Sequence, residues 1–240
     1  MHLEHLKELN LARAGRKAII LTTDIETGQS AIVREGDPWQ NHDLAQELAL
    51  RFRSGKSGMV TGADGKDVFL KVQVPPPRLI VIGAVHISQA MAPIAAMADF
   101  EMIVVDPRSA FASPERFPNV ALHADWPEDV LPGLGLDPYT GFAALTHDPK
   151  IDDWAIAHAL NSECFYVGAL GSRKTHASRL ERLADMGITN EVANRIDAPI
   201  GADIGAASPA EIAVAVFANV IAALRQRSDL ASQRKDEVAA

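Results

Sequence analysis

The chain has 240 residues, of which 48% are hydrophobic and 5% are aromatic. That length suits one large domain or two small ones, each with a buried core. The formal net charge of −8 opposes non-specific binding to nucleic acid, and no basic stripe with interleaved aromatic residues counters it. Cys164 is the only cysteine, which excludes an internal disulfide and a cysteine-based zinc cluster.

The sequence also lacks the patterns of targeting and membrane segments. Residues 1–8 are polar and unlike the apolar core of a signal peptide. No apolar run approaches the roughly 18 residues of a membrane-spanning helix. We therefore expect a soluble cytoplasmic protein that binds neither nucleic acid nor membranes.

Three consecutive prolines at 75–77 mark the clearest boundary, because such a run continues neither a helix nor a central strand. The region before them, residues 1–74, is predicted to be a small α+β domain. Within it, Asp64-Gly65 has the turn chemistry of a hairpin. The expected strands are 17–23, 29–34, 58–61 and 67–74, and the expected helix is 38–54.

After the prolines, short apolar runs alternate with helical patterns. This rhythm predicts βαβ units and a parallel sheet, that is, a Rossmann-like doubly wound α/β domain over residues 78–227. A polar tail at 228–240 is expected to fray. The helix at 172–186 is expected to turn its arginine and glutamate side chains outward. The expected strands are 79–82, 102–105, 120–123, 141–146 and 164–170, and the other helices follow Gly83 to about Asp99 and span 154–161 and 212–227.

Ligands bind such sheets outside the carboxyl ends of the strands, which first selects residues 83–88 and Asp106. Residues 83–88 stand where dinucleotide-binding folds place Gly-x-Gly-x-x-Gly, but Val85 replaces the second glycine. Asp106 ends the second strand, where an acid can bond a ribose diol. Two interpretations stay open: a nucleotide-like ligand at the helix N-terminus, or a scaffold that has lost its pyrophosphate site.

The same rule selects His147 and Asp148, which end a predicted strand in front of Pro149. The histidine could act as a general base, orient a ligand or bind a metal. Alternatively, His147 fills a crevice while Asp148 caps the next turn. His86 could likewise face the site, or it could simply cap the first helix. The histidines show no His-x-x-x-His spacing, and we expect no metal site.

Residues 168–174 join a strand to a helix through two glycines and place Ser172, Arg173 and Lys174 at the helix start. Cations there oppose the helix dipole, which points to an anionic ligand. The alternative is solvated surface charge, with Ser172 as an ordinary N-cap. Cys164 is expected to pack as a small hydrophobic residue.

Several of these segments resemble the XdhC/CoxI family of accessory proteins for molybdenum hydroxylases such as xanthine dehydrogenase and carbon monoxide dehydrogenase. The resemblance covers most of residues 79–227. It implies a Rossmann domain that binds the molybdenum cofactor, supports addition of its terminal sulfur and assists its insertion into the apo-enzyme. The similar stretches are 145–150, 165–176, 198–206 and 208–214.

The resemblance and the strand-end rule together give a set of cofactor-binding residues, with no catalytic residue assigned. The implied partners are a hydroxylase apo-enzyme and a fuller XdhC paralogue or a sulfur donor. An apolar face on the terminal helix could also mediate formation of a homodimer. A non-catalytic insertion chaperone is favoured over an enzyme. The cofactor-binding residues are Gly83, His86, Asp106, Arg108, His147, Asp148, Gly168, Gly171, Ser172, Arg173, Lys174 and Asp203.

The sequence departs from the family pattern at two places. The family usually has Gly-x-Gly-His after the first Rossmann strand, whereas residues 83–86 keep only the first glycine and His86. Its amino-terminal domain usually carries Gly-Ser-Ala-Pro-Arg-like and Gly-Cys-Val-Glu motifs. Here that domain is shortened and free of cysteine, and residues 27–31 show at most a weak similarity to these motifs. A thiolate in this domain therefore cannot hold molybdenum or carry sulfur.

Two other functions stay open. Asp106 and the fold favour an NAD(P)-dependent oxidoreductase, although no hydride-transfer constellation supports it and NAD(P) is not the expected ligand. The third is a regulatory or scaffold protein whose Rossmann site is empty.

Overall fold

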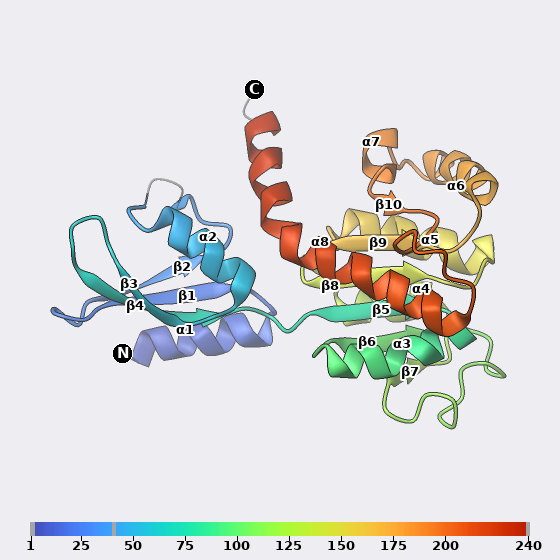
Figure 1. The fold of residues 1–240 in the computed structure, drawn as a ribbon, viewed down its shortest axis with the longest axis horizontal. Helices are drawn as coiled ribbons and strands as arrows, with labels where there is room; N and C mark the ends of the chain where they lie inside the picture. The colour runs from blue at the N-terminus through green and yellow to red at the C-terminus, as the bar shows by residue number, and fades with distance from the viewer. Residues whose placement is uncertain (1–2, 40–41, 239–240) are drawn as a thin grey trace. The chain divides into compact units, whose positions relative to one another are not determined.

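The computed structural model describes residues 3–39 and 42–238, and the chain divides into two compact units. The first contains the chain up to Pro75 and the segment from Arg225, and the second runs from Pro76 to Leu224. Each unit has a sheet of its own, as Figure 1 shows.

The first unit is built on a four-stranded antiparallel sheet in the order β2-β1-β4-β3. Ile19 and Leu21 of β1 pack against Leu9 of helix α1, which the sequence did not predict. The predicted helix at 38–54 is shorter, because a turn at His42 precedes it and α2 begins only at Ala45; residues 40–41 lie outside the described residues. The elements are α1 (Leu3–Ala14), β1 (Ile19–Asp24), β2 (Ser30–Arg34), α2 (Ala45–Ser54), β3 (Gly58–Thr61) and β4 (Asp67–Gln73).

The second unit is built on six parallel strands in the order β10-β9-β8-β5-β6-β7. The sheet starts in the middle with β5, grows to one edge through β7, and then grows from β8 to the other edge. This is the strand order of dinucleotide-binding Rossmann folds, with the switch point between β5 and β8, and it confirms the predicted fold class. The strands are β5 (Arg78–Ile82), β6 (Glu101–Val105), β7 (Ala121–His123), β8 (Thr140–Ala144), β9 (Tyr166–Ala169) and β10 (Ile196–Asp197).

Strand β5 is buried along its whole length because it lies between two apolar cores. Leu79 and Val81 belong to the core that contains helices α3 (His86–Met97) and α8 (Pro209–Val238). Ile80 and Ile82 belong to the core on the other side, which contains helix α5 (Pro149–Asn161). A parallel sheet covered on both faces needs apolar residues at consecutive positions, which is the run visible in the sequence.

The helices of the second unit begin at recognisable caps. Asp148 caps α5, and Pro149 takes the first helical position, so this helix starts well before the predicted Trp154. Helix α4 was not predicted, because Pro132 interrupts its pattern. The helices are α3 (His86–Met97), α4 (Pro127–Leu134), α5 (Pro149–Asn161), α6 (Arg173–Asp185), α7 (Asn190–Ala193) and α8 (Pro209–Val238).

Helix α8 differs from two expectations. It continues past Arg227 to Val238, where the tail was expected to fray, since that segment is rich in good helix formers. Its stretch Pro209–Arg227, with a mean hydropathy of 1.2, is also long and apolar enough to cross a membrane by length and composition alone. Val216 and Phe217 of this stretch are buried in the core against the parallel sheet, and 28% of its most apolar 18-residue window is buried.

Candidate functional site

The turn after β5 lies at the switch point and has room only for glycine. Gly83 has φ +117°, and a Cβ atom there would lie 3.0 Å from Cγ2 of Thr146, which follows β8. The turns after β5 and β8 therefore pack directly on each other. This close approach requires glycine at position 83, although the second glycine of the dinucleotide-binding motif is replaced by Val85.

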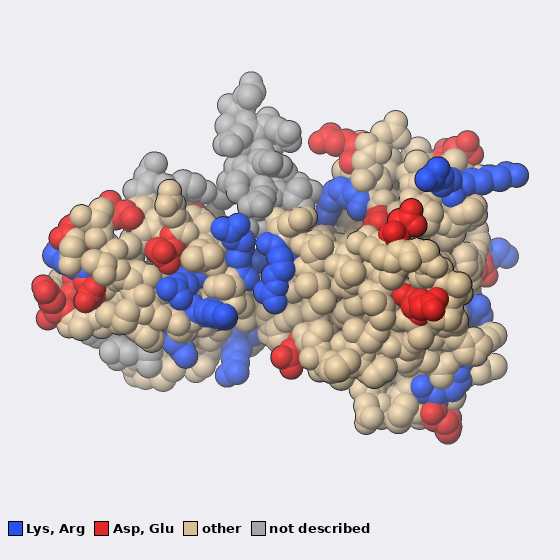
Figure 2. Space-filling view, in the orientation of Figure 1, with Lys and Arg blue, Asp and Glu red and all other residues tan. Residues whose placement is uncertain are grey.

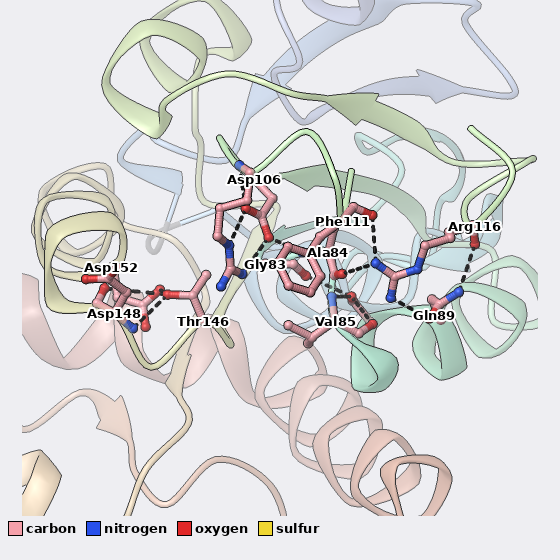
Figure 3. Close-up of polar contacts among 12 residues, drawn as sticks. Gly83, Ala84, Val85, Gln89, Asp106, Phe111, Arg116, Thr146, Asp148 and Asp152 are labelled. Carbon is pink, nitrogen blue, oxygen red and sulfur yellow. Dashed lines mark hydrogen bonds and ion pairs between the residues drawn. The ribbon is translucent and has the colours of Figure 1, made fainter. Parts of the chain in front are cut away.

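The amide donors of this turn bond within the protein (Figure 3). Ala84 N–H donates to Asp106 Oδ2 at 2.7 Å. Val85 N–H donates to the Ser88 hydroxyl at 2.9 Å, and this hydroxyl donates to the Gly83 carbonyl at 2.7 Å. A dinucleotide-binding turn offers such N–H groups to a pyrophosphate, whereas these two are in use.

Both carboxylate oxygens of Asp106 are also in use. Arg108 donates its backbone N–H and Nε–H to Oδ1, and its Nη2 to Oδ2, at 2.7–2.9 Å. Burial by itself raises the pKa of Asp106, but the hydrogen bonds from Arg108 and Ala84 outweigh it and hold the pKa below its usual value. The hydrogen bond to Asp106 raises the pKa of Arg108. A ribose diol would have to compete with these bonds.

A second arginine, Arg116, holds the same turn and was not singled out from the sequence. It donates to the carbonyls of Ala84 and Phe111 at 2.9 and 2.8 Å and to Gln89 Oε1 at 2.7 Å. The half-exposed Phe111 ring contacts the guanidinium groups of both Arg116 and Arg108. Arg116 lies in an irregular loop, so no periodic pattern marks it.

The turn after β8 gives its two predicted residues different settings. Asp148 accepts the Lys150 N–H at 3.0 Å and donates its own N–H to Thr146 Oγ1 at 3.0 Å. His147 is exposed and has φ +64°. Asp148 therefore caps α5, and cofactor binding by either residue stays a prediction.

Two buried charged residues lie behind this turn, and the sequence did not identify either of them. Asp152 accepts the Thr146 hydroxyl at 2.8 Å, and burial raises its pKa to about 6. Arg179 donates through Nη2 to the Leu170 carbonyl at 2.9 Å, and burial lowers its pKa. The expectation that the arginines of α6 face outward is wrong for Arg179, which is 2% exposed.

Strand β9 and the segment after it contain five of the predicted residues. A Cβ atom on Gly168 would lie 2.6 Å from Ile200 Cγ1, so packing alone requires glycine there. Gly171 has φ +135°, and Ser172 caps α6 by accepting the Thr175 N–H. The predicted residues of this segment that are exposed are Ser172, Arg173 and Lys174.

The remaining candidates, His86 and Asp203, take no part in these hydrogen bonds. His86 and Asp203 are exposed and make no hydrogen bond with the other candidates. Burial raises the pKa of the Cys164 thiol to about 12, which suits a packed hydrophobic side chain. Within the described ranges, no three His, Cys, Asp or Glu side chains form a group that could hold a metal ion.

The structure thus brings one part of the predicted set together. Asp106 bonds to Arg108 and to the amide of Ala84, next to Gly83, and the charge of Arg108 also interacts with Asp148 and Asp152. The result is a polar edge across the ends of β6, β5 and β8. A sequence profile of the XdhC Rossmann domain matches residues 79–220, the region that carries this edge.

The chain belongs to the XdhC family.

Three curated relatives share the region. YqeB of Escherichia coli K12 is 31% identical over 172 residues, covering 70% of this chain and 31% of that protein. A protein of Bacillus subtilis 168 that is named as a probable component of xanthine dehydrogenase is 32% identical over 156 residues, covering 65% and 45%. PaoD of E. coli K12, a molybdenum cofactor insertion chaperone, is 29% identical over 156 residues, covering 65% and 43%. This chain therefore spans less than half the length of these relatives.

A solved structure shares the fold. The crystal structure described as a xanthine dehydrogenase from Bacillus halodurans matches 93% of this XdhC-family chain and 65% of its own, with a TM-score of 0.63 and 22% identity. At that identity the match concerns the fold alone.

Proposed function

We propose that this XdhC-family protein binds the molybdenum cofactor as cargo, supports its sulfuration and assists its insertion into a molybdenum hydroxylase of the xanthine dehydrogenase or CO dehydrogenase type. The observation that carries the proposal is the family match over residues 79–220, together with a relative named as a molybdenum cofactor insertion chaperone. The proposed setting is the cytoplasm.

The geometry of the first turn supports a cargo other than an ordinary dinucleotide. The N–H groups of Ala84 and Val85 and the carboxylate of Asp106 are the groups that NAD(P) would need, and all of them bond within the protein. Because those groups are already in use, the first turn is less favourable for NAD(P) than a turn of the ordinary dinucleotide-binding type.

The chain retains polar atoms that suit a polar cargo. Asp152 and Arg179 are almost fully buried, and each has atoms that bond to none of the residues the structure describes. The exposed cations Arg173 and Lys174 stand at the start of α6, where a phosphate-bearing ligand is favoured. When bound, the cofactor supplies the molybdenum–dithiolene chemistry that the hydroxylase later uses. The proposed role of the chain is to bind, orient and release it.

The chemistry of sulfuration then requires a partner. Residues 1–75 contain no cysteine, and Cys164 is buried with a raised thiol pKa. We therefore propose that a fuller paralogue or a separate sulfur donor supplies the terminal sulfur, and that the hydroxylase apo-enzyme receives the cofactor.

Reconstitution of a hydroxylase tests the proposal. An apo-hydroxylase is mixed with limiting molybdenum cofactor, with and without this protein, and recovered activity is measured over time. The proposal predicts faster or more complete activation with the protein, and no effect of bovine serum albumin at the same concentration. Equal activation in both mixtures, combined with micromolar calorimetric binding of NAD or NADP, would favour the oxidoreductase.

A further inference from the structure

Asp152 and Arg179 carry hydrogen-bonding capacity that the described part of the chain does not use. Asp152 Oδ2 accepts no hydrogen bond there, and Arg179 Nε and Nη1 donate none. The two residues are 1% and 2% exposed. Polar groups buried this deeply normally have partners, because an unpaired one loses its hydrogen bonds to water without replacement.

The two side chains are held in place by their other atoms. Thr146 donates its hydroxyl to Asp152 Oδ1, and Arg179 Nη2 donates to the Leu170 carbonyl. The two charges attract each other, yet no nitrogen–oxygen pair between them comes within 4.0 Å. Asp152 Oδ2 and Arg179 Nε and Nη1 therefore keep hydrogen-bonding capacity for a third group.

This pair is connected to the candidate site. Asp152 lies in the first turn of α5 after β8, and Thr146 joins it to the Gly83 turn at the switch point. Arg179 lies in α6 after β9, and its Nη2 is 3.8 Å from the position that a Cβ atom on Gly171 would take. The pair thus belongs to the second half of the doubly wound sheet, where the far end of an extended ligand lies.

The chemistry of the free atoms selects the ligand group. One free carboxylate oxygen accepts an N–H, and the free guanidinium N–H groups donate to a carbonyl oxygen. The pair has no net charge, so a phosphate dianion would place uncompensated charge beside Asp152 inside the protein. A neutral lactam edge, with N–H adjacent to C=O, satisfies both residues without added charge. The pyrimidinone ring of a pterin presents such an edge.

We propose that Asp152 and Arg179 recognise the lactam edge of a pterin-class heterocycle, Asp152 accepting its N–H and Arg179 donating to its carbonyl. This assignment rests on the proposed function, because it names the part of the cofactor that this end of the site holds.

The test compares two fluorescent probes on the full chain: pterin, and 2-aminopteridine, which lacks the lactam carbonyl and its N–H. Binding is followed by fluorescence titration for the wild type and for the variants Asp152→Asn and Arg179→Lys. Asp153→Asn and Arg182→Lys are the matched controls, since these residues pair with each other on the same two helices. Thermal melting confirms that every variant is folded.

The wild type and both controls are expected to bind pterin at least tenfold more tightly than 2-aminopteridine. This preference should shrink to within about twofold in each variant of the pair. A wild type without the preference, or variants that keep it, overturns the assignment. Displacement of pterin by inorganic phosphate in an Arg179-dependent way would identify an anion site instead. Retention of the intact cofactor on gel filtration is measured separately and decides the proposed function, so the two failures are distinguishable.

Discussion

At the scale of single residues, Asp152 is a carboxyl group that the fold buries almost completely. Its pKa is raised from 3.8 to about 6, first by burial and further by the nearby Asp153, while Thr146 and Arg179 pull it down. The pKa of Arg108 is in turn raised, first by its hydrogen bond to Asp106 and in smaller part by Asp152. Near neutral pH, Asp152 therefore carries a negative charge that the surrounding protein interior disfavours.

This setting predicts a pH dependence of stability. The folded protein keeps the Asp152 proton up to about pH 6, whereas the unfolded chain releases it near pH 4. The stabilising contribution is thus complete below about pH 4 and lost as the pH rises to about 6, with a total of about 3 kcal/mol. Urea unfolding at pH 4, 5, 6 and 7 should show that Asp152→Asn gains stability relative to the wild type across this window. Parallel curves for the two proteins would contradict the raised pKa.

At the scale of elements, the site depends on close packing behind the strand ends. Gly168 of β9 lies against the side chains of Ile200 and Tyr166, and the Tyr166 hydroxyl donates to Asp197 Oδ2 at 2.6 Å. Asp197 also accepts from Asn219 of α8. The residues around Gly168 therefore tie β9, β10 and α8 together beneath the turn that leads into α6.

A methyl group at position 168 should disturb this packing. In Gly168→Ala the new Cβ would lie 2.6 Å from both Ile200 Cγ1 and Tyr166 Oη, and we expect a loss of about 1–3 kcal/mol in the free energy of unfolding. Gly133→Ala is the control, because nothing lies within 4 Å of its Cβ position and α4 favours alanine. It should be neutral or up to about 1 kcal/mol more stable. Equal stability of the two variants would show that Gly168 is not packed as described.

The elements differ in how far the sequence could reveal them. The parallel strands were visible because strands such as β5 are buried on both faces and read as unbroken apolar runs. Helix α4, with Pro132 inside it, and the short β10 carry no such pattern. The strand-end rule located the turn at Gly83 and the acid Asp106, since topology alone fixes them. The sequence did not reveal Arg116, Asp152 and Arg179, because their roles arise from contacts across loops and between helices.

At the scale of the whole molecule, the exposed surface adds an apolar face to the polar edge. In the second unit, α8 lies toward the viewer in Figure 1, and Figure 2 shows that face largely free of charged side chains. Val214 and Ile221 of α8 are 54% and 38% exposed. An acidic chain with one such face suits contact with another protein, and the hydroxylase, a paralogue and a second copy of this chain remain the proposed partners.

Native mass spectrometry of the protein loaded with molybdenum cofactor tests the central claim most directly. The protein is incubated with the free cofactor and separated from unbound cofactor by gel filtration, and the mass of the intact complex is measured. A parallel sample is treated in the same way with NAD. The account predicts a species heavier than the chain by the mass of the cofactor, and no NAD adduct. A spectrum with only the unliganded chain after cofactor loading, or with NAD bound in its place, would contradict it.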